Sequence, residues 1–143
     1  MPQSTICADT GNQATISFAT GIAYTLKARR IVQPQEQVEK VECSDLATVT
    51  YRKYIGADLV DTPELEVEYI WDTFNVPPAL NLNLGLVTIT YPLRTGETTP
   101  ATRSGSGYVS GITHPTLANG ELQVGTLKIQ FDNVTALTYT KST

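Results

Sequence analysis

Residues 64–71 read ELEVEYIW and alternate between acidic and apolar side chains. In an extended chain, four large apolar residues fall on one face: Leu65, Val67, Tyr69 and Trp71. Three acidic residues fall on the opposite face: Glu64, Glu66 and Glu68. Because successive side chains of a strand point to opposite sides, this period of two predicts a strand with one buried and one solvated face.

Similar strand-like runs lie on both sides of this stretch. Four runs rich in β-branched, aromatic and aliphatic residues are GIAYTLKARRIV (21–32), LATVTYRKYI (46–55), GLVTITY (85–91) and GELQVGTLKIQFD (120–132). Residues that favour turns, or polar residues, fill the connections between the runs, at 57–63, 75–83, 94–107 and 114–120. The pattern predicts an all-β fold, mainly an antiparallel β-sandwich or barrel, with at most one short helix.

Residues 34–43 fit two structures. Glutamates and valines recur there at a spacing of three: Glu36, Glu39 and Glu42, and Val38 and Val41. This spacing suits a short helix with Pro34 in its first turn. A strand with one slip in its alternation suits the same residues, and both interpretations stay open.

The apolar alternation changes phase within residues 120–132. Leu122 and Val124 occupy even positions, whereas the apolar residues that follow occupy odd positions: Leu127, Ile129 and Phe131. An unbroken strand would turn one of these two sets towards solvent. We therefore expect a β-bulge at Gly125, or a sharp bend there.

The chain has 143 residues, which fits a single domain over 1–143, with the polar residues 1–14 as an N-terminal arm. Charged residues make up only 17% of the chain, against a typical fraction of about 25%. A low charged fraction suits a protein that covers part of its surface with copies of itself. The net charge of -4 argues against nucleic-acid binding, and we interpret the basic cluster Lys27, Arg29 and Arg30 as a solvated strand face.

Metal binding, secretion and membrane insertion find no support in the sequence. Two cysteines, Cys7 and Cys43, and the single histidine, His114, are too few for a zinc site. The first residues show no signal-peptide pattern, and no run approaches the roughly 18 apolar residues of a membrane span. We therefore expect no metal, no membrane partner and synthesis in a reducing cytosol.

The stretch GSGYVSGITHP (105–115) looks most like a catalytic or phosphate-binding site. It lacks the third glycine and the helix of a dinucleotide loop, and the Lys-Ser/Thr end of a P-loop. Ser110 and His114 would stand about 13 Å apart on an extended chain, too far for a nucleophile and its base. We therefore expect a flexible Gly-Ser entry into a strand, no cofactor and no enzymatic activity.

Three stretches resemble the major tail tube proteins of long-tailed bacteriophages. They are VEKVECSDLATVTYRKYIGADLVDTPELEVEYIWD (38–72), LGLVTITYPL (84–93) and GSGYVSGITHPTLANGELQVGTLKIQFDN (105–133). The resemblance covers about residues 15–140 and extends to the tube proteins of contractile tails and of type VI secretion. The family usually carries a helix after the position of Trp71 and Asp72, where this chain reads TFNVPPALNLNLG and is poorly suited to one.

The resemblance implies a β-sandwich or barrel whose hexameric rings stack into a hollow tube for DNA, without catalytic residues. In such a tube, Glu64, Glu66 and Glu68 would form an acidic lumen wall that repels DNA. Strand 120–131 would pair across subunits. Three elements are candidates for the contacts between rings: the polar arm 1–14, the loop 55–63 and the C-terminal TKST (140–143). In the loop, the contact residues would be Ile55, Gly56, Ala57, Asp58, Leu59, Val60 and Asp61.

The implied partners are other copies of the chain and other tail proteins, namely the tape measure, the terminator and the baseplate or tip. DNA would pass through without specific binding. The implied location is the phage tail of a virion assembled in the host cytoplasm. Two alternatives stay open: another virion component, such as a head decoration, neck or tail-completion protein, and a carbohydrate or adhesion binding module.

Overall fold

The structure, a computed structural model, describes residues 14–20, 26–45, 47 and 50–143. Within these residues the chain forms strands and no helix. The strands are β1 (Thr15–Phe18), β2 (Lys27–Val32), β3 (Gln37–Glu42), β4 (Tyr54–Asp61), β5 (Leu65–Ile70), β6 (Asn83–Thr90), β7 (Thr102–Thr113), β8 (Val124–Phe131) and β9 (Thr138–Thr140). The predicted all-β, antiparallel fold is confirmed.

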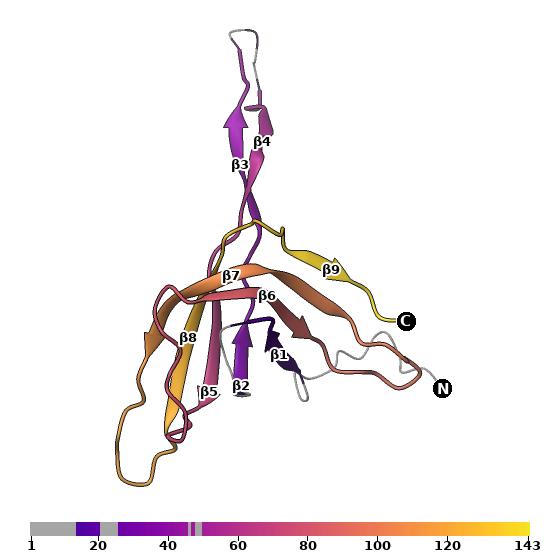
Figure 1. The fold of residues 1–143 in the computed structure, drawn as a ribbon. Coiled ribbons are helices and arrows are strands. Elements are labelled where there is room, and N and C mark those ends of the chain that lie inside the picture. Colours follow the sequence, from indigo (N-terminus) through magenta and orange to yellow (C-terminus); the bar gives the residue numbers. More distant parts are fainter. Residues whose placement is uncertain (1–13, 21–25, 46, 48–49) are drawn as a thin grey trace.

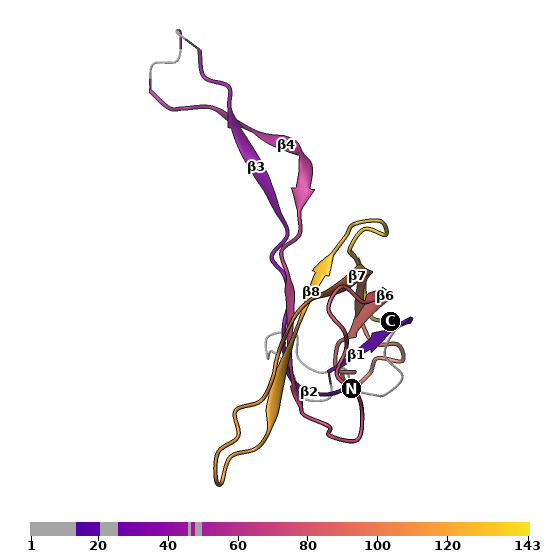
Figure 2. The ribbon, with the colours of Figure 1, turned by 60° about the vertical axis from the view of Figure 1, so that its left-hand side comes forward.

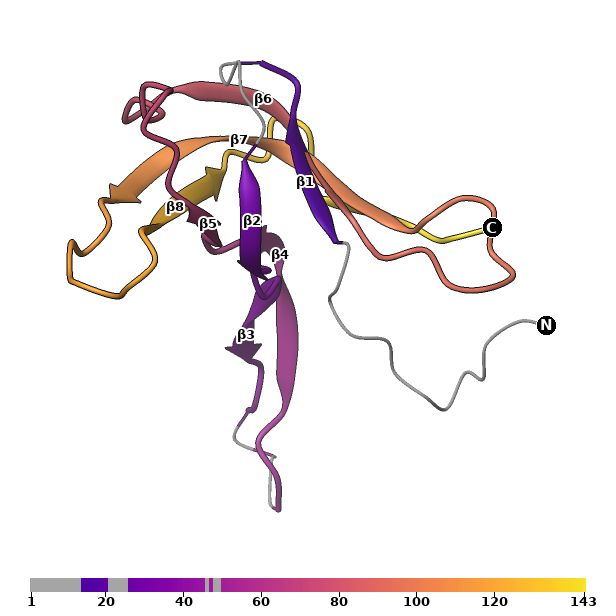
Figure 3. The same ribbon diagram turned by 90° about the horizontal axis from the view of Figure 1, so that it is seen from below.

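Seven strands form one antiparallel sheet in the order β1-β6-β7-β8-β5-β2, with β9 added to β7. The sheet curls, so that it resembles a barrel left open between its end strands β1 and β2 (Figure 3). Its inner face holds the core: Ile16, Leu26, Leu65, Val67, Tyr69, Leu84, Val87, Ile89, Val109, Leu127, Ile129 and Phe131. The remaining strands, β3 and β4, form a separate two-stranded hairpin that projects from the sheet (Figure 1).

Strand β7 organises the sheet because it pairs along both of its edges. One edge pairs with β6 over Thr102–Tyr108, and the other pairs first with β9 at Thr102–Ser104 and then with β8 from Gly107 to Thr113. Two buried glycines let β8 and the chain that follows it pass close to β7. A Cβ on Gly105 would lie 3.0 Å from Cα of Leu137, and one on Gly107 would lie 2.9 Å from the carbonyl oxygen of Gln130.

The expectation of a flexible Gly-Ser entry at 105–107 is therefore wrong. These residues lie inside β7, and the predicted connection 94–107 ends where the strand begins, at Thr102. The prediction missed the strand because glycine is a weak strand former, whereas here it is required by the close approach of neighbouring backbone.

The alternatives for residues 34–43 are resolved in favour of a strand, β3. The register between β3 and β4 shifts between Val38 and Lys40, which agrees with a slip in the alternation. The predicted connection at 57–63 is wrong, because residues 57–61 belong to β4 and pair with β3. Of the run 46–55, only Tyr54 and Ile55 lie in a strand, while residues 46, 48 and 49 lie outside the described part of the chain.

The predicted β-bulge at Gly125 is wrong. The ladder between β5 and β8 runs without a shift from Leu65↔Ile129 to Ile70↔Val124, and the extra residue in the β7–β8 ladder, Ser110, lies on β7. Gly125 keeps the inward phase of β8, and the indole ring of Trp71 occupies the space where its side chain would be. Leu122 lies before β8 begins, so its position in the apolar alternation does not affect the strand.

The position of β8 also corrects the expectation that residues 120–131 pair across subunits. Strand β8 lies between β7 and β5, so both of its edges are occupied.

The described residues contain no helix long and apolar enough to cross a membrane.

Replacing Gly125 should destabilise the fold through Trp71. A Cβ at this position would lie 2.5 Å from Cε3 of Trp71, so Gly125→Ala should lower the free energy of unfolding by about 1–3 kcal/mol, measured by urea denaturation. Gly111→Ala is the matched control, since its Cβ would meet only the Lys128 side chain at 3.7 Å. Equal effects of the two substitutions would contradict this account.

Candidate assembly surface

The hairpin β3–β4 extends a ribbon that begins in the sheet. Strand β2 continues into β3 through residues 33–36, and β4 continues into β5 through residues 62–64 (Figures 1 and 2). Strands β2 and β5 pair inside the sheet, and β3 and β4 pair outside it. All residues of β3 are exposed, and in β4 only Ala57 is partly buried. The hairpin therefore presents both of its faces to the surroundings.

Each face of the hairpin carries a cross-strand apolar pair. Val38 stands opposite Val60 on one face, and Val41 stands opposite Ile55 on the other, with each side chain about half exposed. A two-stranded hairpin is marginally stable alone in water, and contiguous exposed apolar residues mark interaction sites. A flat partner surface would cover only one of the two apolar pairs. A partner surface on each side of the hairpin would cover both.

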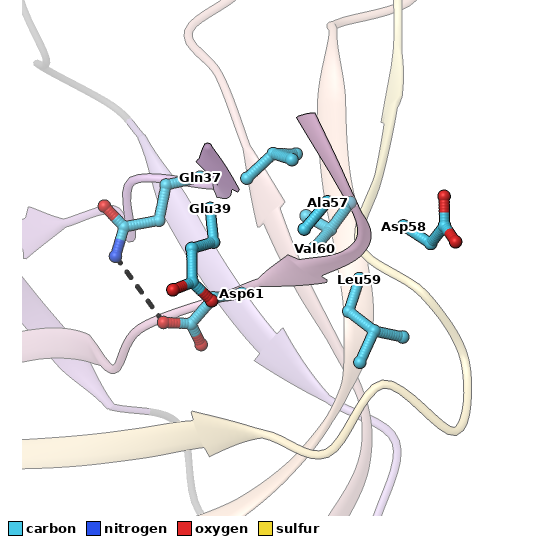
Figure 4. A pocket seen from close by; sticks show the side chains of 8 residues that line it. Gln37, Glu39, Ala57, Asp58, Leu59, Val60 and Asp61 are labelled. Carbon is cyan, nitrogen blue, oxygen red and sulfur yellow. Dashed lines mark hydrogen bonds between the residues drawn. The ribbon is translucent and has the colours of Figure 1, made fainter. Parts of the chain in front are cut away.

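The base of the hairpin is irregular. Between the pairs Val38↔Val60 and Lys40↔Gly56, β4 has three residues, 57–59, where β3 has only Glu39. Beside this irregularity lies an open surface hollow of about 800 Å³, lined by Gln37, Val38, Glu39, Ala57, Asp58, Leu59, Val60 and Asp61. In Figure 4, Asp58 and Leu59 turn away from Gln37 and Glu39, and Leu59 is 84% exposed. We call these eight residues the hairpin root.

Polar contacts fix the direction of the hairpin where it leaves the sheet. Arg103 Nη2 lies 2.7 Å from Glu36 Oε1, and Arg103 Nη1 donates to Gln33 Oε1 at 3.0 Å and to the carbonyl oxygen of Pro34 at 3.3 Å. The Tyr91 hydroxyl donates to the same Gln33 oxygen at 2.8 Å. These bonds attach the linker 33–36 to strand β7 and to the residue that follows β6.

The second linker is attached as well. Gln130 Nε2 donates to the carbonyl oxygen of Thr62 at 3.0 Å, and Thr62 is buried. With both linkers held, the hairpin stands as an extension of the sheet rather than as a free loop.

The seven residues expected to make contacts between rings, residues 55–61, all lie in β4. The sequence placed them in a loop, and the structure brings Ala57, Asp58, Leu59, Val60 and Asp61 together at the hairpin root.

Glu64, Glu66 and Glu68 lie in and beside β5, directed away from the core, as the alternation predicts. The structure brings them next to basic residues that are distant in the sequence. Glu66 stands opposite Lys128, Glu68 stands opposite Arg30, and Glu68 Oε1 lies 3.9 Å from Arg29 Nη1. The Ser110 hydroxyl donates to Glu64 Oε2 at 3.0 Å. This sheet face is therefore mixed in charge rather than purely acidic.

A second apolar surface lies where β5 ends, at the end of the ribbon away from the hairpin (Figure 1). A hollow of about 310 Å³ is lined by Leu26, Lys27, Ile70, Trp71, Asp72, Thr73 and Phe74. We call it the Trp71 hollow. Phe74 is 97% exposed, and Trp71 packs between Gly125 and the ring of His114, whose centroid lies 5.1 Å away. Sequence reasoning missed this surface, although a Trp-Asp-x-Phe run before a turn is a signal for it.

The structure does not form a serine–histidine pair. Ser106 donates to the carboxylate of Asp132, and Ser110 donates to Glu64. The Ser106 hydroxyl and the backbone N–H of Val134 hold the pKa of Asp132 below its usual value. His114 follows the end of β7 and packs on Trp71. Within the described residues, no group of three potential metal ligands is present.

No protein-family model matches the sequence, and no curated protein matches it. The fold does have solved counterparts. Chains of contractile injection systems share it.

One counterpart belongs to the structure of the extracellular contractile injection system PVC, sheath/tube terminator in the extended state. It has a TM-score of 0.72 and 8% identity, and the match covers 96% of this chain and 99% of that chain. Another belongs to the six-fold symmetrised baseplate of the anti-feeding prophage, with a TM-score of 0.65, 12% identity and coverage of 90% and 91%.

The attachment by Arg103 gives the first prediction for this surface. The Arg103 side chain is only 16% exposed, so Arg103→Met should lower the free energy of unfolding by about 1–3 kcal/mol in urea. Arg52→Met is the control, because the Arg52 side chain is 75% exposed and lies 3.9 Å from Glu42, so its loss should change stability by less than about 1 kcal/mol. If Arg103→Met leaves the free energy of unfolding unchanged, the bonds of Arg103 to the linker do not stabilise the fold.

The exposed apolar pairs should contribute little to the fold of a single molecule. Ile55→Thr and Val60→Thr should each change the free energy of unfolding of the monomer by less than about 0.5 kcal/mol. Val67→Thr should cost about 1–3 kcal/mol, because it buries a hydroxyl group in the core. Urea denaturation of dilute, monomeric protein checks all three, and a large loss at Ile55 or Val60 would assign the hairpin to the fold instead.

Proposed function

We propose that this protein is a structural subunit that assembles into stacked hexameric rings and forms the hollow tube of a phage tail or a phage-like injection particle. The observation that carries the proposal is the hairpin that is hydrogen-bonded to the sheet at both linkers and carries exposed apolar pairs on both faces. Such a hairpin gains stability when neighbouring subunits cover it, and a heterologous contact that closes generates a ring.

The contacts between rings are assigned to residues 55–61 of β4. These residues belong to the projecting hairpin, and they combine exposed Ile55, Leu59 and Val60 with the carboxylates of Asp58 and Asp61. Contacts that are apolar at the centre and charged at the rim are typical of specific protein interfaces.

The shared fold supports an assembly role. The two solved counterparts come from a sheath/tube terminator structure and from a baseplate structure with six-fold symmetry, and both match over nine-tenths or more of their own chains. The proposal transfers the six-fold ring and the tail-like location to this chain. Other tail proteins at the two ends of the tube are the proposed partners, with assembly in the cytoplasm of the host and no enzymatic role.

A second candidate is a subunit of a terminal ring, such as a neck or tail-completion protein. The specific observation in its favour is that one counterpart is named for a tube terminator. A terminal subunit would form a single ring and would not stack, so the length of the assembly separates the two candidates.

The lumen-facing role of Glu64, Glu66 and Glu68 remains part of the proposal. These residues occupy an exposed sheet face, and their carboxylates would repel DNA within a Debye length of about 8–10 Å. Lys128, Arg29 and Arg30 beside them reduce this repulsion, so the wall would be weakly rather than strongly acidic.

The deciding experiment is negative-stain electron microscopy of the purified protein over a concentration series, with light scattering on the same samples. Stacked rings or hollow tubes are expected, and single rings would favour the terminal subunit. Ile55→Lys/Val60→Lys should form rings that do not stack, while Leu117→Lys, which changes a more exposed apolar residue outside the hairpin, should stack normally. Wild-type protein that stays monomeric at every concentration would contradict self-assembly.

The position of the acidic residues is tested in the same assemblies. A cryo-EM map of the tube should show Glu64, Glu66 and Glu68 on the wall of the lumen. A map that places these side chains on the outer surface would refute the proposed lumen wall without affecting the tube itself.

A further inference from the structure

The hairpin root needs a partner with a particular chemistry. Its exposed apolar residues, Val38, Leu59 and Val60, are surrounded by the carboxylates of Glu39, Asp58 and Asp61. A complementary surface must therefore offer an apolar depression with basic groups on its rim.

The Trp71 hollow has this chemistry. Leu26, Ile70, Trp71 and Phe74 supply its apolar lining, and the exposed Lys27 lies on its rim. Further along β2, Arg29 and Arg30 stand beside Glu68, so Lys27 supplies the positive charge of the rim. One lining residue, Asp72, is acidic. Its carboxylate already accepts hydrogen bonds from the backbone N–H of Phe74 at 2.9 Å and from Asn75 Nδ2 at 2.6 Å.

The two surfaces lie at different ends of one ribbon. Strand β2 starts at the Trp71 hollow and leads through the linker 33–36 into β3 and the hairpin root (Figures 1 and 2). One molecule therefore cannot bring them together, but two molecules related by a shift along the ribbon can. Lys27 and Glu39 are twelve residues apart, so at about 3.3 Å per residue the shift is at most about 40 Å.

We infer that the hairpin root of one copy docks on the Trp71 hollow of the next copy along the stack. Leu59 enters the hollow, and Asp58 faces Lys27 on its rim. The contact is heterologous, so it repeats from ring to ring without closing on itself. This inference rests on the proposed stacking function and adds the identity of the receiving surface.

A charge-exchange experiment tests the inference. Asp58→Lys places a lysine against Lys27, and Lys27→Glu places a glutamate against Asp58, so each variant alone should lose at least tenfold in light scattering from stacked assemblies. Mixing the two separately purified variants should restore stacking, because the two exchanged side chains have opposite charges and meet wherever rings of the two variants alternate. Glu121→Lys, which changes an exposed carboxylate that lines neither surface, is the control and should stack like the wild type.

The possible results separate this inference from the proposed function. If the wild type stacks and either Asp58→Lys or Lys27→Glu stacks equally well, the inferred contact is wrong and the tube role stands. If both variants fail and their mixture also fails, Asp58 and Lys27 do not meet across copies, which again refutes the contact. A spacing between rings well above about 40 Å would refute it independently. Wild-type protein that does not assemble refutes the proposed function, and the contact with it.

Discussion

Strand β7 has two edges with which to satisfy the hydrogen bonds of its backbone, and the arrangement of the sheet depends on how they are shared. One edge is given to β6, while the other is divided between β9 and β8. This division is sterically feasible because Gly105 and Gly107 have no side chains where Leu137 and Gln130 approach. The curl of the sheet brings residues from distant parts of the chain, such as Ile16 and Phe131, into one core.

The chain separates the residues that stabilise one molecule from those available to neighbours. The core residues lie on the inner face of the curled sheet, whereas the valines and isoleucine of the hairpin lie outside it. The network around Arg103 joins the two parts by polar contacts. The hairpin can therefore be presented in a fixed direction while its apolar side chains remain uncovered.

The sequence predicted those strands in which one face is buried and the other is solvated. Strand β5 is the clearest case, because Leu65, Val67 and Tyr69 face the core and the residues between them do not. The prediction failed for residues 57–61, since β4 is exposed on both faces and shows no alternation. It also failed at Gly125, where the missing side chain is replaced by Trp71, a residue remote in sequence.

The candidate site was predictable only in part. Residues 55–61 were assigned to contacts from a family resemblance, whereas their apolar pairing with β3 depends on a cross-strand register that local patterns do not specify. The Trp71 hollow is assembled from the beginning of β2 and the end of β5, so it becomes recognisable only once these strands are paired.

The continuity of the ribbon has a mechanical consequence. A tensile force along the hairpin is transmitted directly to β2 and β5, because both linkers are short and attached to the sheet. Strand β5 is paired on both sides, with β2 and with β8. Hydrogen bonds in an antiparallel ladder run perpendicular to the strands, so this load acts on many bonds in shear at once. A subunit with this geometry resists tension along the axis of the ribbon far better than a subunit whose arm would peel away one bond at a time.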